Sequence, residues 1–105
     1  MEPTWHSQTA RLLGEPVVDR KGERIGTVAE VAFEPNTLAP EWLVVKTSIF
    51  GRRRLVPIES AQSEGDTIRV PYSKETVLDA PVPEIPGSLA TRERTELLAY
   101  YQHAA

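Results

Sequence analysis

Residues 25–34, IGTVAEVAFE, alternate between larger apolar and smaller or polar side chains in a pattern typical of a β-strand. Successive side chains of a strand point to opposite faces of its sheet. This strand therefore places Ile25 and Val31 on one face and Val28 and Ala32 on the other. At least one of these faces must be buried in a core.

Segments on both sides of this stretch also have strand composition, and turn residues separate them. Residues 19–23, DRKGE, are suited to reversing the chain into a hairpin, whereas the polar residues 59–65 read as a turn. Short strands spaced about ten residues apart are typical of a small barrel or sandwich. We therefore predict an all-β barrel of about six strands, with strands at residues 16–19, 25–34, 41–47, 54–58 and 67–70.

The strand predicted at residues 41–47, EWLVVKT, is apolar on both of its faces. Leu43 and Val45 make one face, and Trp42 and Val44 make the other. A strand with one face in water would carry polar residues there. We therefore expect another part of the protein to cover the second face.

The C-terminal third changes from strand to helix patterns. Ser73 is placed to cap a short helical turn through Leu78, which we expect to plug one end of the barrel. Residues 81–86 are rich in proline and cannot continue a helix. A second helix is expected over residues 88–103, with Ser88 or Thr91 as its cap and with Leu97, Leu98 and Tyr101 at helical spacing.

The domain organisation follows from these segments. We expect a lead-in at residues 1–10, a barrel at 11–81, a proline-rich linker at 82–87 and a helical tail at 88–105. A chain of 105 residues is long enough for one core. It contains no window as apolar as a membrane span and no signal-peptide pattern at its start, so we expect a cytoplasmic protein.

Several of these segments, taken in order, resemble the PRC-barrel family. The residues that carry the resemblance are GEPVVDRKGERIGTV at 14–28, WLVV at 42–45, LVPI at 55–58 and IRVPYSK at 68–74. PRC-barrel domains occur in the photosynthetic reaction-centre H subunit and in the ribosome maturation factor RimM. This chain has neither a transmembrane helix nor an RNA-processing domain beside its barrel, so it is similar to the stand-alone bacterial members. The family shares no catalytic motif, and the resemblance implies an adaptor or assembly role.

The second apolar face is the main candidate for a protein interface. Two alternatives stay open. The C-terminal helix covers this face within one chain, or a homodimer buries it, either directly or by exchange of the helix across the proline-rich linker. The candidate interface residues are Val28, Ala32, Trp42, Val44, Phe50, Leu97, Leu98 and Tyr101.

The triplet Arg52, Arg53 and Arg54 follows Phe50 and Gly51 in a predicted hairpin turn. Guanidinium groups bind phosphate through charge-assisted hydrogen bonds, so the triplet is a candidate site for an anion or for RNA. The net charge of the chain is −3, which argues against a generally basic surface. A solvated turn is therefore the favoured interpretation of these arginines.

No constellation of residues points to catalysis, a cofactor or a metal site. The chain has no cysteine, and its two histidines, His6 and His103, stand near opposite termini without carboxylates at ligand spacing. No serine has a neighbouring base, and no glycine-rich phosphate loop is present. We therefore expect no enzyme activity, no cofactor, no metal and no small-molecule substrate.

The sequence thus favours a non-enzymatic adaptor that binds an unidentified protein partner through its barrel surface and C-terminal helix, as a homodimer. The alternative is an RNA- or ribosome-associated assembly factor that uses the arginine-rich turn. Binding by the arginines would fall steeply with salt, whereas an interface centred on Trp42 would be less sensitive to salt.

Overall fold

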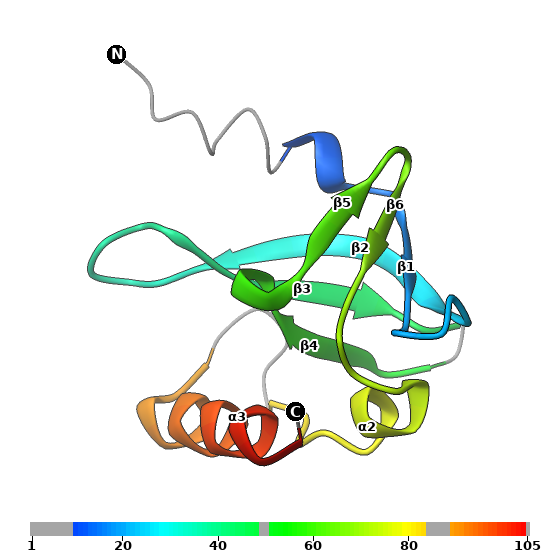
Figure 1. Ribbon diagram of the computed structural model, residues 1–105. Coiled ribbons are helices and arrows are strands. Elements are labelled where there is room, and N and C mark those ends of the chain that lie inside the picture. Colours follow the sequence, from blue (N-terminus) through cyan, green and yellow to red (C-terminus); the bar gives the residue numbers. More distant parts are fainter. Residues whose placement is uncertain (1–9, 49–50, 84–88, 105) are drawn as a thin grey trace.

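The computed structural model describes residues 10–48, 51–83 and 89–104 (Figure 1). The five predicted strands are present, each within one residue of its predicted bounds. The elements, in chain order, are β1 (Pro16–Val18), β2 (Arg24–Phe33), β3 (Pro40–Lys46), β4 (Arg53–Pro57), the 3₁₀ turn η1 (Ile58–Ser60), β5 (Gln62–Glu64), β6 (Thr67–Arg69), α2 (Lys74–Leu78) and α3 (Thr91–Ala104).

Residues 59–65, predicted as a turn, contain a sixth strand. β5 pairs antiparallel with β6, and its three side chains are exposed. The pattern of apolar residues does not reveal such a strand, because only its backbone pairs with the sheet. β6 in turn pairs in parallel with β1, which joins strands about fifty residues apart.

The six strands form one sheet in the order β4-β3-β2-β1-β6-β5. β4 and β5 stand at opposite ends of this order, yet only residues 58–61 connect them. Six strands in a flat sheet would place the outer two about 24 Å apart. The five steps from Pro57 to Gln62 reach at most about 18 Å. The sheet must therefore curl, although no ladder between β4 and β5 closes it into a barrel in the described residues.

A β-bulge at Ala29 reverses the face assignment of half of β2. Val28 pairs with Val45, and Ala32 pairs with Trp42, with the register shifted between Val28 and Glu30. Paired residues point to the same side of a sheet, and Trp42 and Val45 are three positions apart in β3. The prediction that Val28 shares a face with Ala32 was therefore wrong, because the extra residue in the bulge breaks the alternation.

Two layers of apolar side chains result from this arrangement. The concave face of the sheet buries Val28, Leu43, Val45 and Val56. The opposite face of the sheet carries Trp42, Val44 and Leu55, which are also buried. Both helices pack on the side below β4 in Figure 1. The two layers together make one core.

The predicted short helical turn is confirmed as α2. Ser73 caps it, because its hydroxyl oxygen accepts a hydrogen bond from the Thr76 amide at 3.1 Å. Val77 of α2 is fully buried. The predicted C-terminal helix is also present, and it begins at Thr91. The Glu93 carboxylate accepts a hydrogen bond from the Ala90 amide at 2.9 Å, which satisfies one of the free N–H groups at this helix start.

Candidate interaction surfaces

Helix α3 covers the second apolar face of β3 within the same chain. Trp42 is 1% exposed, and Leu97 and Tyr101 of α3 are 1% and 2% exposed. The rings of Trp42 and Tyr101 lie 6.4 Å apart between centroids, and those of Tyr72 and Tyr101 lie 4.7 Å apart. The apolar face that the sequence left open is therefore part of the core of one chain.

Polar contacts fix α3 in this position. Arg94 donates two hydrogen bonds to the Glu41 carboxylate, at 2.8 and 2.6 Å, and the Trp42 indole donates a third to it at 2.9 Å. The hydrogen bonds from Arg94 lower the pKa of the Glu41 carboxyl below its ordinary value. A bidentate pair of this kind fixes orientation as well as adding energy.

Two tyrosine hydroxyls extend this attachment. Tyr101 donates to the Leu55 carbonyl at 2.6 Å, on the edge strand β4, and Tyr100 donates to the Thr76 carbonyl at 2.5 Å, on α2. Burial raises the pKa of the Tyr101 phenol above its ordinary value. An exposed edge strand invites pairing with another chain. The bond from Tyr101 occupies one backbone group of β4.

Most of the candidate interface residues are buried within the chain by this packing. Val44 is buried, as are Val28, Trp42, Leu97 and Tyr101. Ala32 and Leu98 are partly buried and pack against the same core. Phe50 lies outside the described residues. The structure therefore brings the predicted apolar residues together, but inside the chain and not on its surface.

The arginine triplet divides between two environments. Arg52 and Arg53 are exposed, and Arg53 lies 3.9 Å from Glu30, with both side chains 49% exposed. Arg54 is half-buried, and its Nε has no hydrogen-bond partner among the described residues. Because Arg54 pairs with Val45, it projects to the concave side of the sheet. Two of the three guanidinium groups are therefore available on the surface.

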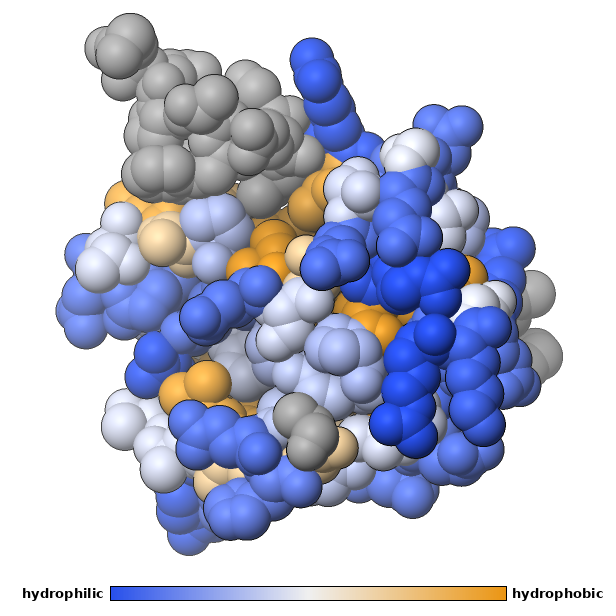
Figure 2. Space-filling view, viewed as in Figure 1, coloured by the Kyte–Doolittle hydropathy of each residue, from blue (hydrophilic) through white to orange (hydrophobic). Residues whose placement is uncertain are grey.

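A surface that the sequence did not predict lies at the tip of the β2–β3 hairpin. Leu38 is 59% exposed and has a φ of 59°, and Phe33 at the end of β2 is 39% exposed. A left-handed backbone conformation is unfavourable for a leucine. Figure 2 shows an apolar area at the left, where this hairpin extends in Figure 1. No sequence signal distinguishes Leu38 from an ordinary loop leucine.

Glu34 holds this loop in its conformation. Its carboxylate accepts hydrogen bonds from the amides of Asn36 at 3.0 Å and Thr37 at 2.6 Å. The bond from Thr37, aided by the one from Asn36, lowers the pKa of the Glu34 carboxyl. The Leu38 amide donates to the Glu34 carbonyl at 2.7 Å, and the Glu34 amide donates to the Ala39 carbonyl at 2.8 Å. The exposed leucine is therefore presented by a preorganised loop.

A groove runs beside the base of the same hairpin. Its volume is about 280 Å³, and it lies between the outer face of β2 and β3 and the segment that leads into α3. Two glutamates, Glu30 and Glu41, line it. Its other lining residues include Ala32, Phe33, Pro35, Pro83 and Leu89. The hairpin tip and this groove together form what we call the hairpin surface, which is apolar at its centre, while Glu30 and Glu41 at its rim pair with Arg53 and Arg94.

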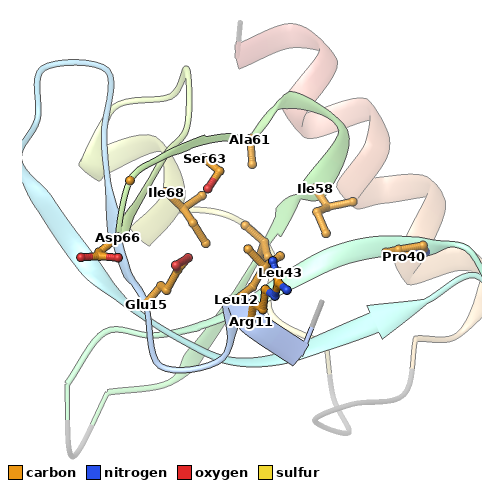
Figure 3. A pocket seen from close by; sticks show the side chains of 11 residues that line it. Arg11, Leu12, Glu15, Pro40, Leu43, Ile58, Ala61, Ser63, Asp66 and Ile68 are labelled. Carbon is orange, nitrogen blue, oxygen red and sulfur yellow. The ribbon is translucent and has the colours of Figure 1, made fainter. Parts of the chain in front are cut away.

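A second hollow lies on the concave side of the sheet (Figure 3). It has a volume of about 760 Å³, and its walls are mainly apolar, with Leu43 of β3, Ile58 of η1 and Ile68 of β6 among them. Glu15 also lines it, and one carboxylate oxygen of Glu15 is buried without a hydrogen-bond partner in the described residues. The expectation of no small-molecule substrate stays a prediction.

Two further findings concern metals and membranes. Among the described residues, no group of three or more histidines, aspartates and glutamates is arranged to hold a metal ion. None of the helices in the described ranges combines the length and the apolar character that spanning a bilayer requires.

The comparisons with known proteins agree with the resemblance found in the sequence. The family model described as the PRC-barrel domain matches residues 7–77, which is more than half of the chain. The match runs from before β1 into α2 and leaves α3 outside. No protein of curated function matches the chain significantly.

Proposed function

The chain belongs to the PRC-barrel family, whose domains serve protein interaction and assembly, and from this premise we propose that it is a non-enzymatic adaptor that binds a protein partner through the hairpin surface. The observation that carries the proposal is Leu38. Single exposed leucines are common on protein surfaces, so the 59% exposure of Leu38 counts because the exposed Phe33 and an apolar groove lie on the same hairpin. The backbone of Leu38 is also held in an unfavourable conformation, and strain of this kind concentrates at functional sites.

The chemistry of the hairpin surface indicates the kind of partner. Leu38 offers an anchor for an apolar pocket, and the groove beside Phe33 accepts an apolar side chain in return. The glutamates around these apolar groups already have partners in the chain, since Glu30 pairs with Arg53 and Glu41 with Arg94. The apolar groups are therefore what the hairpin surface offers. The partner is a protein segment that presents an apolar pocket to Leu38 and an apolar side chain to the groove.

Homodimerisation stays within the proposal, but its route changes. The sequence left open whether the C-terminal helix of the same chain or a homodimer buries the Trp42 face, and α3 covers this face within one chain. Two copies can still associate by exchanging α3 or through their hairpin surfaces. The first route depends on Leu97 and the second on Leu38, so variants at these two positions separate them.

The test is site-specific photo-crosslinking. A photoreactive phenylalanine analogue replaces Leu38 in one variant and Leu13 in a matched control, since Leu13 is 53% exposed but precedes β1 and is not part of the hairpin. We expect a defined crosslinked product in cells from position 38 and none from position 13. Products of equal yield from both positions, or no product from position 38, would overturn the proposal.

A stability measurement separates binding from folding. Asparagine tolerates a positive φ better than leucine, so Leu38→Asn should keep the melting temperature unchanged or raise it. The same variant should lose the partner in pull-down experiments, whereas Leu13→Asn should retain it. A Leu38→Asn variant that is less stable than the wild type would show that Leu38 serves the fold and not a partner.

A further inference from the structure

The topology gathers cationic side chains at one end of the curled sheet. β2 and β3 are antiparallel, with Thr27 paired to Lys46, and β3 and β4 are antiparallel, with Lys46 paired to Arg53. The start of β2, the end of β3 and the start of β4 therefore lie side by side. This arrangement places Arg24, Lys46 and Arg53 on three adjacent strands, with Arg52 next to them in the β3–β4 connection.

The β1–β2 turn adds two more cations to this end. Arg20 and Lys21 lie in the turn and are exposed. Asp19, which is 2% exposed, fixes the turn, because its carboxylate accepts hydrogen bonds from the amides of Lys21 and Glu23, both at 2.8 Å. It also accepts one from the Lys74 amide at 3.3 Å, which ties the turn to α2. The turn is therefore rigid where its cations project.

Gly26 permits the close approach of these strands. A Cβ atom at this position would lie 2.2 Å from the backbone oxygen of Lys46, a separation that no side chain tolerates. Only glycine therefore lets the end of β3 pass so close to the start of β2. Neighbouring strands are about 4.8 Å apart, so the paired residues Lys46 and Arg53 lie side by side, while Arg24 lies further along at the start of β2.

We define the basic end as Arg20, Lys21, Arg24, Lys46, Arg52 and Arg53, all of which are exposed. These are six of the twelve lysines and arginines in a chain of net charge −3. Among the described residues, these six cations make one salt bridge, which joins Arg53 to Glu30. The nearby Glu23 lies 3.8 Å from Lys74, which is outside the set. Figure 2 shows strongly hydrophilic side chains at the right, where this end lies.

We propose that the basic end binds the phosphate backbone of a nucleic acid. Concentrating half of the cations on one end of an acidic protein costs repulsive energy that a polyanion would relieve. Four of the six side chains are arginines, whose planar guanidinium groups match phosphate oxygens better than the lysine ammonium does. The contacts are to phosphate, so binding is independent of base sequence.

The linkage of the phosphates favours nucleic acid over a membrane surface. The phosphates of a nucleic acid are covalently joined in a row, so one molecule meets several cations of the basic end. The β3–β4 connection also contains Ile49 and Phe50, which lie outside the described residues. Apolar side chains beside cations are typical of peripheral membrane binding, so anionic vesicles are the competing partner in the test below.

This inference goes beyond the proposed adaptor function and does not depend on it. The hairpin surface and the basic end share no residue. Leu38→Asn should therefore leave nucleic-acid binding unchanged, and variants of the basic end should leave the crosslink from position 38 unchanged. Failure of one proposal is thus distinguishable from failure of the other.

Fluorescence anisotropy with a labelled single-stranded RNA of about sixteen nucleotides tests the inference. If the basic end contacts about four phosphates, affinity should fall roughly 20-fold between 50 and 150 mM salt. Arg24→Ala/Arg52→Ala should weaken binding about tenfold or more at 50 mM salt. The matched control Arg11→Ala/Arg92→Ala removes two exposed arginines outside the basic end and should bind within about twofold of the wild type.

Each other outcome overturns the inference. Equal losses in the two double variants would show that only total charge matters. Absence of binding at 50 mM salt would refute the site, and so would binding to anionic vesicles or polyglutamate that exceeds binding to the RNA. Melting curves check that both variants fold, and a second pair, Lys21→Ala/Lys46→Ala, should repeat the loss seen with the first.

Discussion

Asp19 shows how one residue connects the fold to a surface. Its buried carboxylate accepts hydrogen bonds from three backbone amides and so joins the β1–β2 turn to the start of α2. Burial alone would raise the pKa of Asp19, but the bonds from Glu23, Lys21 and Lys74 outweigh it and lower the pKa. The ionised form is therefore the one that the folded chain stabilises.

The pH dependence of stability should report this carboxylate. The folded-state pKa of Asp19 lies below the ordinary value of 3.8, so its contribution is present above that pH and is lost as the pH falls through the folded-state pKa. Asp19→Asn should cost about 2 kcal/mol near neutral pH, because it weakens charge-assisted hydrogen bonds. It should also flatten the acid side of the stability profile, measured by urea unfolding.

A suitable control is the exposed Asp66, because Asp66→Asn should leave both the stability and its acid dependence unchanged. If Asp19→Asn gives the same profile as the wild type between pH 5 and pH 2.5, the carboxylate does not hold the turn.

Among the elements, β2 determines the positions of both proposed surfaces. Its start lies at the basic end, its far end carries the hairpin tip, and the bulge at Ala29 decides which side chains face the core. β2 also contacts β3 closely at Gly26, where a Cβ would meet the Lys46 carbonyl oxygen. The sheet and the surfaces therefore depend on the same strand.

Gly26→Ala should be severely destabilising, by more than about 2 kcal/mol, because the added methyl group has to displace backbone and not a mobile side chain. Gly65→Ala is the matched comparison. Gly65 has a φ of 65° and open space around its Cβ position, so the cost there is about 1 kcal/mol of backbone strain. Chemical denaturation of both variants measures the difference, and similar losses would contradict the close approach of β2 and β3.

Helix α3 is the element that turns an apolar sheet face into core. Leu97→Ala should cost about 2–5 kcal/mol, because the side chain is 1% exposed and its loss leaves a cavity. In a Trp5→Phe background, Trp42 is the remaining tryptophan. Its fluorescence should shift to the red at lower denaturant concentration in Leu97→Ala than in the exposed-site control Gln102→Ala. Coincident transitions in the two variants would show that α3 does not shield Trp42.

At the scale of the whole molecule, the two proposed surfaces lie at opposite ends of β2. The strand has ten residues, which corresponds to a length of about 30 Å. The hairpin tip and the β1–β2 turn are therefore well separated. The two surfaces approach each other at one point, because Arg53 of the basic end lies 3.9 Å from Glu30, which lines the groove of the hairpin surface.

The oligomeric state is a property of the whole molecule. If the protein is the proposed homodimer, light scattering at about 100 µM should give a mass of twice 11.7 kDa. Loss of the dimer in Leu38→Asn would assign it to the hairpin surface, whereas loss in Leu97→Ala alone would assign it to exchange of α3. A mass of 11.7 kDa for the wild type would refute the homodimer and leave the protein-partner proposal standing.

The sequence by itself determined the features that depend on neighbouring residues. Alternation located five strands, Ser73 marked the start of α2, and helical spacing found α3 and the residues that it buries. The apolar second face of β3 correctly indicated a covered surface. These patterns are local, because strand and helix periods are imposed by the geometry of the backbone itself.

Only the tertiary structure decided the remaining features. The bulge at Ala29 moved Val28 to the other face, the exposed strand β5 was found by backbone pairing alone, and α3 docked on its own chain. The basic end joins Arg20, Arg24 and Lys46 to Arg52 and Arg53, whereas the sequence had considered the arginine triplet alone. Such features depend on which distant segments pair and pack, and this is decided by the burial energy of the whole core and not by any single stretch of chain.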